Sequence, residues 1–129
     1  MIDQSIEDGT PPEQIVVGGF SQGGAVALGS VLSYPKTLGG SVCWSGWMVG
    51  ALNGNFAKKV HEANKATPVF WGHGAADGVV TPENQTVGVP LLKDNGNPVT
   101  VGTYPGMAHS ACEKETDALA DFLTGLFAA

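Results

Sequence analysis

The residues with the clearest chemical potential lie in the segment Gly19-Phe20-Ser21-Gln22-Gly23. This segment matches G-x-S-x-G, the turn in which a strand passes directly into a helix and raises a nucleophilic serine above a sheet. A β-branched run precedes it and an uncharged helical segment follows it, as that turn requires. The start of the helix would direct unpaired N–H groups toward Ser21, where negative charge develops during attack on a carbonyl. The pattern predicts a nucleophilic serine; the alternative is a glycine-rich turn with an incidental serine.

A serine hydroxyl becomes a strong nucleophile only when a base takes its proton, and histidine is the usual base. The chain has three histidines. His61 lies among charged residues of an expected helix and is interpreted as a surface residue. His73 ends an expected strand, where a structural role is favoured. His109 lies in a glycine-bracketed loop after the last expected strand, so we expect it to be the base.

A carboxylate must hold this histidine in the correct tautomer and stabilise its positive charge. Asp77 lies in a loop that directly follows an expected strand, so we expect it to be the acid. Other aspartates lie in a turn or on the last expected helix and are interpreted as solvated charges: Asp94, Asp117 and Asp121. The order serine, aspartate, histidine along the chain is the order found in α/β-hydrolases.

Composition limits the remaining function classes. The 129 residues suffice for one domain, 1–129, and a net charge of −6 argues against nucleic acid or an anionic membrane as a partner. The apolar runs are too short to span a membrane, so we expect no integral membrane association, and the N-terminus does not resemble a signal peptide. Cys43 and Cys112 are expected to be free thiols, which predicts a reducing, cytoplasmic location. The histidine and cysteine spacings predict no metal site.

Strands and helices must alternate along the chain to position these groups. β-branched and apolar runs predict four strands, at residues 15–19, 41–44, 68–71 and 99–103. Helices are expected at residues 2–8, at 22–33, at 55–65, after Thr81-Pro82 with an interruption or kink at Pro90, and after a capping box at 110–113. The last helix should bury a stripe formed by Leu119, Phe122, Leu123 and Leu126.

This alternation predicts an α/β fold, with a mainly parallel sheet of about four strands and helices on both faces. In such sheets, functional groups gather at the carboxyl ends of the strands. Ser21, Asp77 and His109 each follow an expected strand, so we expect them to meet at one edge of the sheet.

Four ordered motifs together resemble the phospholipase/carboxylesterase family, which includes acyl-protein thioesterases. They are Gly18-Gly19-Phe20-Ser21-Gln22-Gly23-Gly24-Ala25, Ser45-Gly46-Trp47, His73-Gly74-Ala75-Ala76-Asp77 and Tyr104-Pro105-Gly106-Met107-Ala108-His109-Ser110. The resemblance implies a cytosolic serine hydrolase that needs no cofactor and cleaves small-molecule or lipid-acyl esters or thioesters. It implies Ser21 as nucleophile, Asp77 as acid and His109 as base.

The resemblance further implies that the backbone N–H of Gln22 is an oxyanion donor and that Trp47 and Met48 line an apolar acyl groove. It covers the carboxyl-terminal part of the family's domain, so the fold expected is a truncated α/β-hydrolase. The family's first strands and its second oxyanion donor have no counterpart before Met1.

Two alternatives follow from this truncation. One is an acyl-binding protein with poor catalysis, and the other is a fragment of a longer hydrolase. The strand at residues 15–19 would also lack an upstream neighbour, and the helix at 25–32 has no polar face. Exposed strand edges and apolar faces favour pairing with another chain, so we expect a homodimer.

Overall fold

A four-stranded parallel sheet forms the centre of the computed structural model, which describes residues 1–50 and 60–128. The strands are β1 (Val16–Phe20), β2 (Gly40–Trp44), β3 (Val69–Gly74) and β4 (Val99–Tyr104). They lie side by side in the order of the sequence, β1-β2-β3-β4. The predicted α/β fold is confirmed, and each predicted strand is present with small shifts at its ends.

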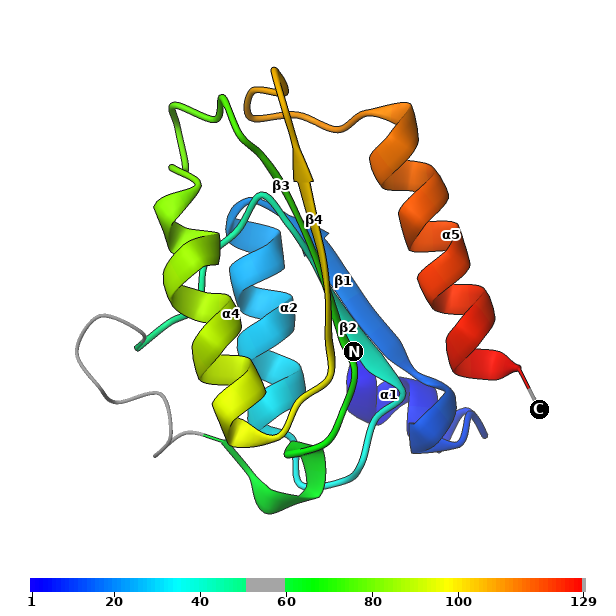
Figure 1. The fold of residues 1–129 in the computed structure, drawn as a ribbon. Helices are drawn as coiled ribbons and strands as arrows, with labels where there is room; N and C mark the ends of the chain where they lie inside the picture. The colour runs from blue at the N-terminus through cyan, green and yellow to red at the C-terminus, as the bar shows by residue number, and fades with distance from the viewer. Residues whose placement is uncertain (51–59, 129) are drawn as a thin grey trace.

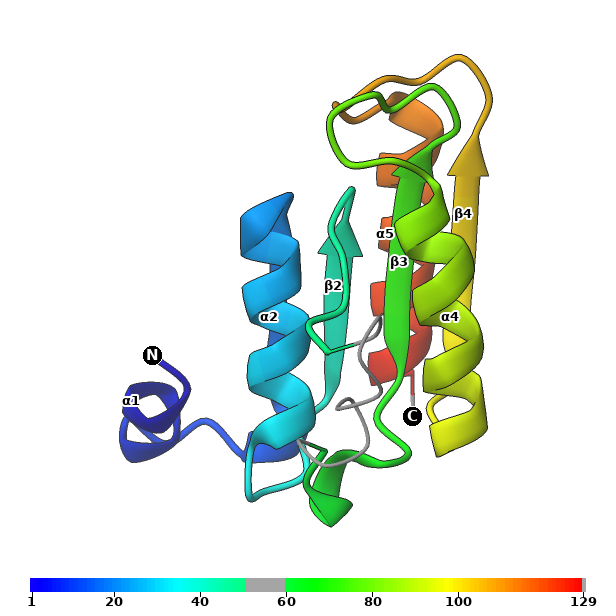
Figure 2. The same cartoon turned by 90° about the vertical axis from the view of Figure 1, so that its left-hand side faces the viewer.

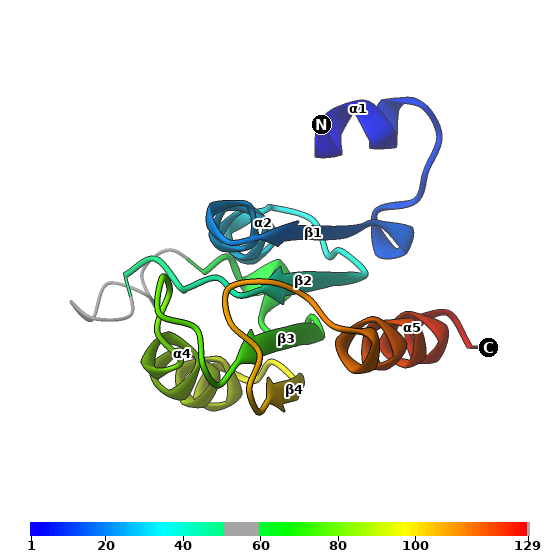
Figure 3. The same ribbon diagram turned by 90° about the horizontal axis from the view of Figure 1, so that it is seen from above.

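Helices cover both faces of this sheet. They are α1 (Ile2–Glu7), α2 (Gln22–Ser33), α4 (Glu83–Asn95) and α5 (Glu113–Phe127), with short 3-10 turns at Pro12–Gln14 and Glu62–Asn64. Helices α2 and α4 lie on one face, and α5 lies on the other (Figure 1). Figure 2 shows α2 and α4 in front of the sheet, with β2 visible between them. Seen from above, α1 lies outside the layers, beyond the β1 edge (Figure 3).

The core is centred on β3, whose residues are all buried. Its Trp71 packs in a cluster with apolar side chains from α2, β2 and α4, including Leu28, Cys43 and Leu92. A Cβ atom at Gly88 of α4 would approach the Trp71 ring to 2.5 Å, so this helix lies directly against the indole. Burial on both faces explains why the sequence of β3 does not alternate between apolar and polar residues.

An interruption or a kink is expected at Pro90 from the sequence, and the interruption is wrong, because α4 continues from Glu83 to Asn95. A proline inside a helix removes one hydrogen bond and costs about 3 kcal/mol. Val89 and Leu92, on either side of Pro90, are both buried in the core. We attribute the continuity of α4 to this packing, which holds both halves of the helix on the sheet.

The start of α5 also differs from the prediction. The residue preceding the helix is Cys112, with no side-chain cap, and the Ser110 hydroxyl instead donates to the Ala111 carbonyl. The predicted capping box is therefore wrong, because the segment before Cys112 belongs to the loop that carries His109. The predicted apolar stripe of α5 is only partly buried, and Glu115 is the buried residue of this helix.

Residues 55–59 of the helix predicted at 55–65 lie outside the described residues, and over residues 60–65 the prediction is wrong. The described end of this segment forms only the 3-10 turn Glu62–Asn64. His61 precedes this turn, and its Nδ1 accepts a hydrogen bond from the Ala63 N–H. This histidine is exposed, in agreement with its interpretation as a surface residue.

The contact between β1 and α2 depends on a glycine. A Cβ atom at Gly19 of β1 would overlap the carbonyl group of Gly23 in the first turn of α2. We expect Gly19→Ala to lower the free energy of unfolding by about 1–3 kcal/mol, because strand and helix must separate to admit the methyl group. Urea unfolding followed by circular dichroism measures this change.

Gly29 provides the matched control, because it lies in α2 and a methyl group added there would meet no heavy atom of the other described residues within 4 Å, apart from the backbone of its own helix. Gly29→Ala should raise the free energy of unfolding by about 0.5–1 kcal/mol through helix propensity. Equal effects of the two substitutions would contradict the assigned contact.

Candidate active site

Ser21 is the single residue that joins β1 to α2. Its backbone has φ 59° and ψ −122°, a strained conformation for a residue with a side chain. Its N–H donates to the Trp44 carbonyl of β2 over 2.7 Å, which fixes the turn on the neighbouring strand. Ser45, at the end of β2, also has positive φ, at 52°. A Cβ atom at the following Gly46 would lie 3.0 Å from the Ser21 carbonyl, so the two turns pack together.

Asp77 and His109 lie in two loops that are joined to each other at the same edge of the sheet. The loop after β3 carries Asp77, and the loop after β4 carries His109. The N–H groups of Ala75 and Ala76 donate to the carbonyls of Tyr104 and Met107 over 2.9 and 3.0 Å. A Cβ atom at Gly74 would overlap the carbonyl of Met107, so this close approach requires glycine. The two loops therefore form one unit above β3 and β4.

A continuous chain of hydrogen bonds connects the three predicted residues. His109 Nδ1 lies 2.8 Å from Asp77 Oδ2, and His109 Nε2 lies 2.9 Å from Ser21 Oγ. Since a carboxylate can only accept, Nδ1–H donates to Asp77, and Nε2 is free to accept from the serine O–H. The Asp77 side chain has no exposed surface, whereas the His109 side chain is 17% exposed. The arrangement gives a buried carboxylate and an imidazole that is partly open to solvent.

The environment of Asp77 keeps its carboxylate charged. Its Oδ1 accepts hydrogen bonds from the N–H groups of Val79 and Val80 over 2.9 and 2.8 Å. Burial alone would favour the neutral carboxyl, but the hydrogen bond with His109 and those from the two backbone groups outweigh it. Together they hold the pKa of Asp77 below its usual value.

Phe20, the residue before Ser21, packs against the His109 ring. The two ring centroids lie 4.8 Å apart at an interplanar angle of 40°. Phe20 directly precedes Ser21, so β1 positions both the serine and an aromatic side chain that contacts the His109 ring. Phe20 is 42% exposed, which leaves an apolar surface beside the site.

The remaining predicted site residues lie in different environments. Gln22 is the first residue of α2, where a backbone N–H has no acceptor inside the helix. Trp47 is half-buried after β2. Met48 is 6% exposed and belongs to the core cluster around Trp71, so its side chain packs in the interior instead of lining an open groove. His73 is buried in β3, as expected for a structural histidine.

The sequence interpretation missed Glu115, which lies in the first turn of α5. Both of its carboxylate oxygens are buried, and neither has a hydrogen-bond partner among the described residues. The carboxylate lies where a Cβ atom of Gly72 would be, directly against β3. Burial raises the pKa of Glu115 to about 7. The sequence signal for its burial was its position, because Glu115 falls at helical spacing with the apolar residues of this helix.

The described residues provide neither a metal site nor a membrane-spanning helix. No group of three or more histidine, cysteine, aspartate or glutamate side chains in 1–50 and 60–128 could hold a metal ion. No helix in this part of the chain is long and apolar enough to cross a membrane. Both cysteines are free, as expected.

Comparison with known proteins identifies related hydrolases. The sequence profile described as Phospholipase/Carboxylesterase matches residues 1–126. Acyl-protein thioesterase 1 of Neurospora crassa is 46% identical over 126 residues, which cover 96% of this chain and 51% of that protein. A rice protein named as a probable inactive carboxylesterase is 38% identical over 117 residues, 91% of this chain and 47% of that protein.

The fold agrees with these relatives. The crystal structure of Arabidopsis thaliana SOBER1 superposes with a TM-score of 0.88 at 38% identity, covering 98% of this chain and 60% of that one. The chain thus spans about half the length of the curated relatives it matches.

The raised pKa of Glu115 predicts how stability changes with pH. The folded protein holds this proton up to pH about 7, whereas the unfolded chain releases it near its ordinary value of 4.5. Stability from this group is therefore complete below about pH 4.5 and is lost as pH rises toward 7. We expect the free energy of unfolding of wild type, relative to Glu115→Gln, to fall by about 1–3 kcal/mol between pH 5 and 7.5.

Urea unfolding of both proteins at these two pH values measures the difference, and the subtraction removes the contribution of the histidines. Glu113→Gln is the matched control, since Glu113 lies in the same turn of α5 but is exposed. A wild type and a Glu115→Gln variant with the same pH dependence would show that Glu115 is ionised normally.

Proposed function

The chain belongs to the phospholipase/carboxylesterase family, and from this we propose that it is a serine hydrolase that cleaves acyl esters or thioesters. The observation that carries the proposal is the hydrogen-bond chain from Asp77 through His109 to Ser21, with distances of 2.8 and 2.9 Å. At these distances the three side chains are already within hydrogen-bond reach, so proton transfer from Ser21 to His109 needs no rearrangement. The chain spans about half the length of its curated relatives. We therefore also propose that this chain is active without further residues.

In the proposed reaction, His109 Nε2 takes the proton of Ser21 as Oγ attacks the carbonyl carbon of the ester. The tetrahedral oxyanion accepts a hydrogen bond from the backbone N–H of Gln22 at the start of α2. His109 then returns the proton to the leaving alcohol or thiol, and the acyl group remains on Ser21. Water, deprotonated by His109, hydrolyses this acyl-enzyme and regenerates the serine.

Asp77 contributes by remaining a carboxylate throughout this cycle. Its low pKa means that it accepts the Nδ1–H bond without taking the proton. The bond keeps Nε2 unprotonated in the resting state and stabilises the imidazolium that forms during attack. Its hydrogen bonds with Val79 and Val80 hold the other oxygen, so the carboxylate cannot turn away.

An apolar acyl group suits the surface beside Ser21. Phe20 and Trp47 are the exposed and half-buried aromatic residues that would contact it. Small-molecule or lipid-acyl esters and thioesters are the substrate class we propose. The two free cysteines are consistent with a reducing compartment, and we propose the cytoplasm.

A second candidate is an acyl-binding protein with little catalysis. The name of the rice relative, a probable inactive carboxylesterase, favours it, as does the partial coverage of the relatives. This candidate predicts that the chain binds an acyl group without turning over an ester.

The first test of the hydrolase proposal is the hydrolysis of p-nitrophenyl butyrate by the purified protein. We expect Ser21→Ala and His109→Gln each to lower the rate by about 10³-fold or more, because the two side chains act as a unit. Ser110→Ala is the matched control, since this serine adjoins His109 and its hydroxyl donates a hydrogen bond to the Ala111 carbonyl in the same loop. Turnover that persists in Ser21→Ala, or its absence in wild type, would rule out the proposed reaction for this chain.

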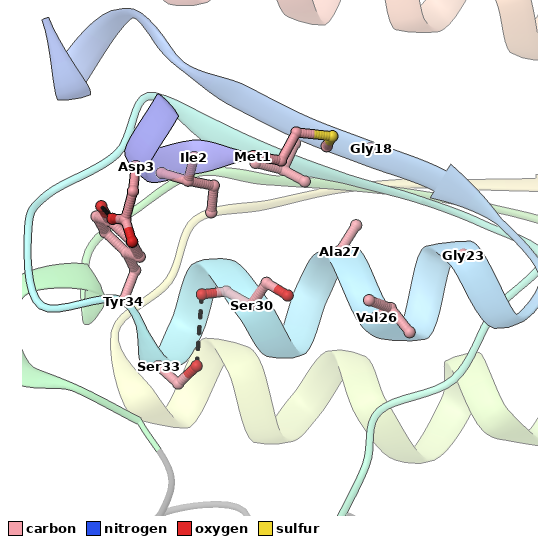
Figure 4. Close-up of a pocket in the computed structure, with 11 residues that line it drawn as sticks. Met1, Ile2, Asp3, Gly18, Gly23, Val26, Ala27, Ser30, Ser33 and Tyr34 are labelled. Carbon is pink, nitrogen blue, oxygen red and sulfur yellow. Dashed lines mark hydrogen bonds between the residues drawn. The ribbon is translucent and has the colours of Figure 1, made fainter. Parts of the chain in front are cut away.

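We further propose that the chain associates through its β1 edge to form a homodimer. Among the described strands, β1 pairs with β2 alone, so its outer backbone groups have no strand to bind. A hollow of about 520 Å³ lies between α1, β1 and α2 and is lined in part by Met1, Ile2 and Val26 (Figure 4). Val26 is 60% exposed on α2. A twofold contact between copies would cover this edge and this valine together.

Light scattering after size-exclusion chromatography tests the association. At micromolar concentration we expect the mass of a dimer for wild type and of a monomer for Val26→Lys, because a charge on the buried face opposes contact. Val79→Lys is the control, since Val79 is 74% exposed but lies in the loop of Asp77. A wild-type monomer that melts cooperatively would show that this edge needs no partner copy.

A further inference from the structure

A second histidine, His73, lies beside the acid of the proposed triad. It is a residue of β3, is completely buried, and lies on the same face of the sheet as Trp71 two positions earlier. Its Nε2 is 3.5 Å from Asp77 Oδ2, the oxygen that also faces His109. Asp77 Oδ1 therefore accepts hydrogen bonds from two backbone N–H groups, and Oδ2 lies between the imidazole rings of His73 and His109.

The partners of His73 define its tautomer. Nε2 lies 2.8 Å from the carbonyl oxygen of Val80, which can only accept, so Nε2 carries the hydrogen. Nδ1 lies 3.4 Å from the indole N–H of Trp71, which can only donate, so Nδ1 offers its lone pair. Both contacts are satisfied together by the neutral ring with its hydrogen on Nε2.

The same contacts close a ring of interactions around the loop that carries Asp77. Val80 donates its N–H to Asp77 Oδ1 over 2.8 Å and accepts from His73 through its carbonyl oxygen. The residue that holds the carboxylate is thus itself held by the imidazole. Because His73 belongs to the central strand β3, this ring ties the loop to the buried core.

His73 cannot replace His109 as the base in this arrangement. Ser21 Oγ is hydrogen-bonded to His109, and the Nε2–H of His73 is directed to the Val80 carbonyl. An apolar residue of similar size would fill the space but would leave the Val80 carbonyl without its donor. A buried carbonyl without a partner is unfavourable, and the loop would avoid this by moving.

We propose that His73 is a positioning residue that clamps the Asp77 loop to β3 and thereby aims Asp77 Oδ2 at His109. This inference rests on the proposed hydrolase function for its kinetic consequence, but the clamp itself is a property of the folded chain. Without the clamp, Asp77 and His109 lose alignment, and a displacement of about 1 Å near reacting groups lowers rates by about 10²-fold. The effect is expected on kcat, because His73 is completely buried and has no surface for a substrate to contact.

Three substitutions separate the clamp from simple packing. His73→Gln places an amide N–H near the position of Nε2, His73→Asn places one near Nδ1, and His73→Met fills the space without a donor. Ester hydrolysis is measured at low temperature with each variant verified as folded by circular dichroism. We expect His73→Gln to keep kcat within about 3-fold of wild type, and His73→Asn and His73→Met to lose about 10–100-fold in kcat with KM unchanged.

A second readout needs no turnover. The proton on His109 Nδ1, hydrogen-bonded to Asp77, gives a downfield proton NMR signal in wild type. We expect this signal to persist in His73→Gln and to shift or broaden in His73→Met. The inference is wrong if folded His73→Met keeps the wild-type signal, or if His73→Gln loses it as completely as His73→Met does. If wild type shows no esterase activity but the NMR signals of wild type and the variants follow this pattern, the proposed function is wrong and the positioning role of His73 is supported.

Discussion

The structure depends on one constraint, the reversal of the chain at Ser21 between β1 and α2. A strand that becomes a helix within one residue requires positive φ at that residue and contact between the two backbones. The overlap expected for a methyl group at Gly19 shows how little space the turn leaves. The turn brings the serine side chain and the start of α2 to the same point, so the proposed nucleophile and the backbone N–H donors both result from one local conformation.

The sheet then brings the partners of this serine to it. In parallel register, Phe20 of β1 lies beside Trp44 of β2, and Gly74 of β3 lies beside Tyr104 of β4, so these strands end at one edge. The groups that follow these ends meet although they are far apart in sequence. The carboxylate and the imidazole proposed as acid and base therefore both belong to the described chain, although it spans about half the length of its curated relatives. The buried Asp77, held through Val80, keeps the charge that the proposed base would require.

Much of this could be predicted from the sequence, because the governing signals are local. The fold was indicated by the glycine-rich turn and by the alternation of strands and helices. The position of each polar group after a strand predicted that Ser21, Asp77 and His109 lie close together. Features decided by tertiary packing could not be predicted. Core contacts at Val89 and Leu92 hold α4 together through Pro90. Met48 belongs to the interior, and Glu115 is buried because a glycine opposite it leaves space.

The central claim is that Ser21, activated by His109 and Asp77, is the nucleophile of this chain. Peptide mapping by mass spectrometry after treatment with a fluorophosphonate tests it most directly, because the reagent phosphonylates activated serines and needs no knowledge of the natural substrate. We expect one phosphonyl group per chain, located on the peptide that contains Ser21. No adduct on the folded protein, or adducts spread over other serines, would contradict this assignment.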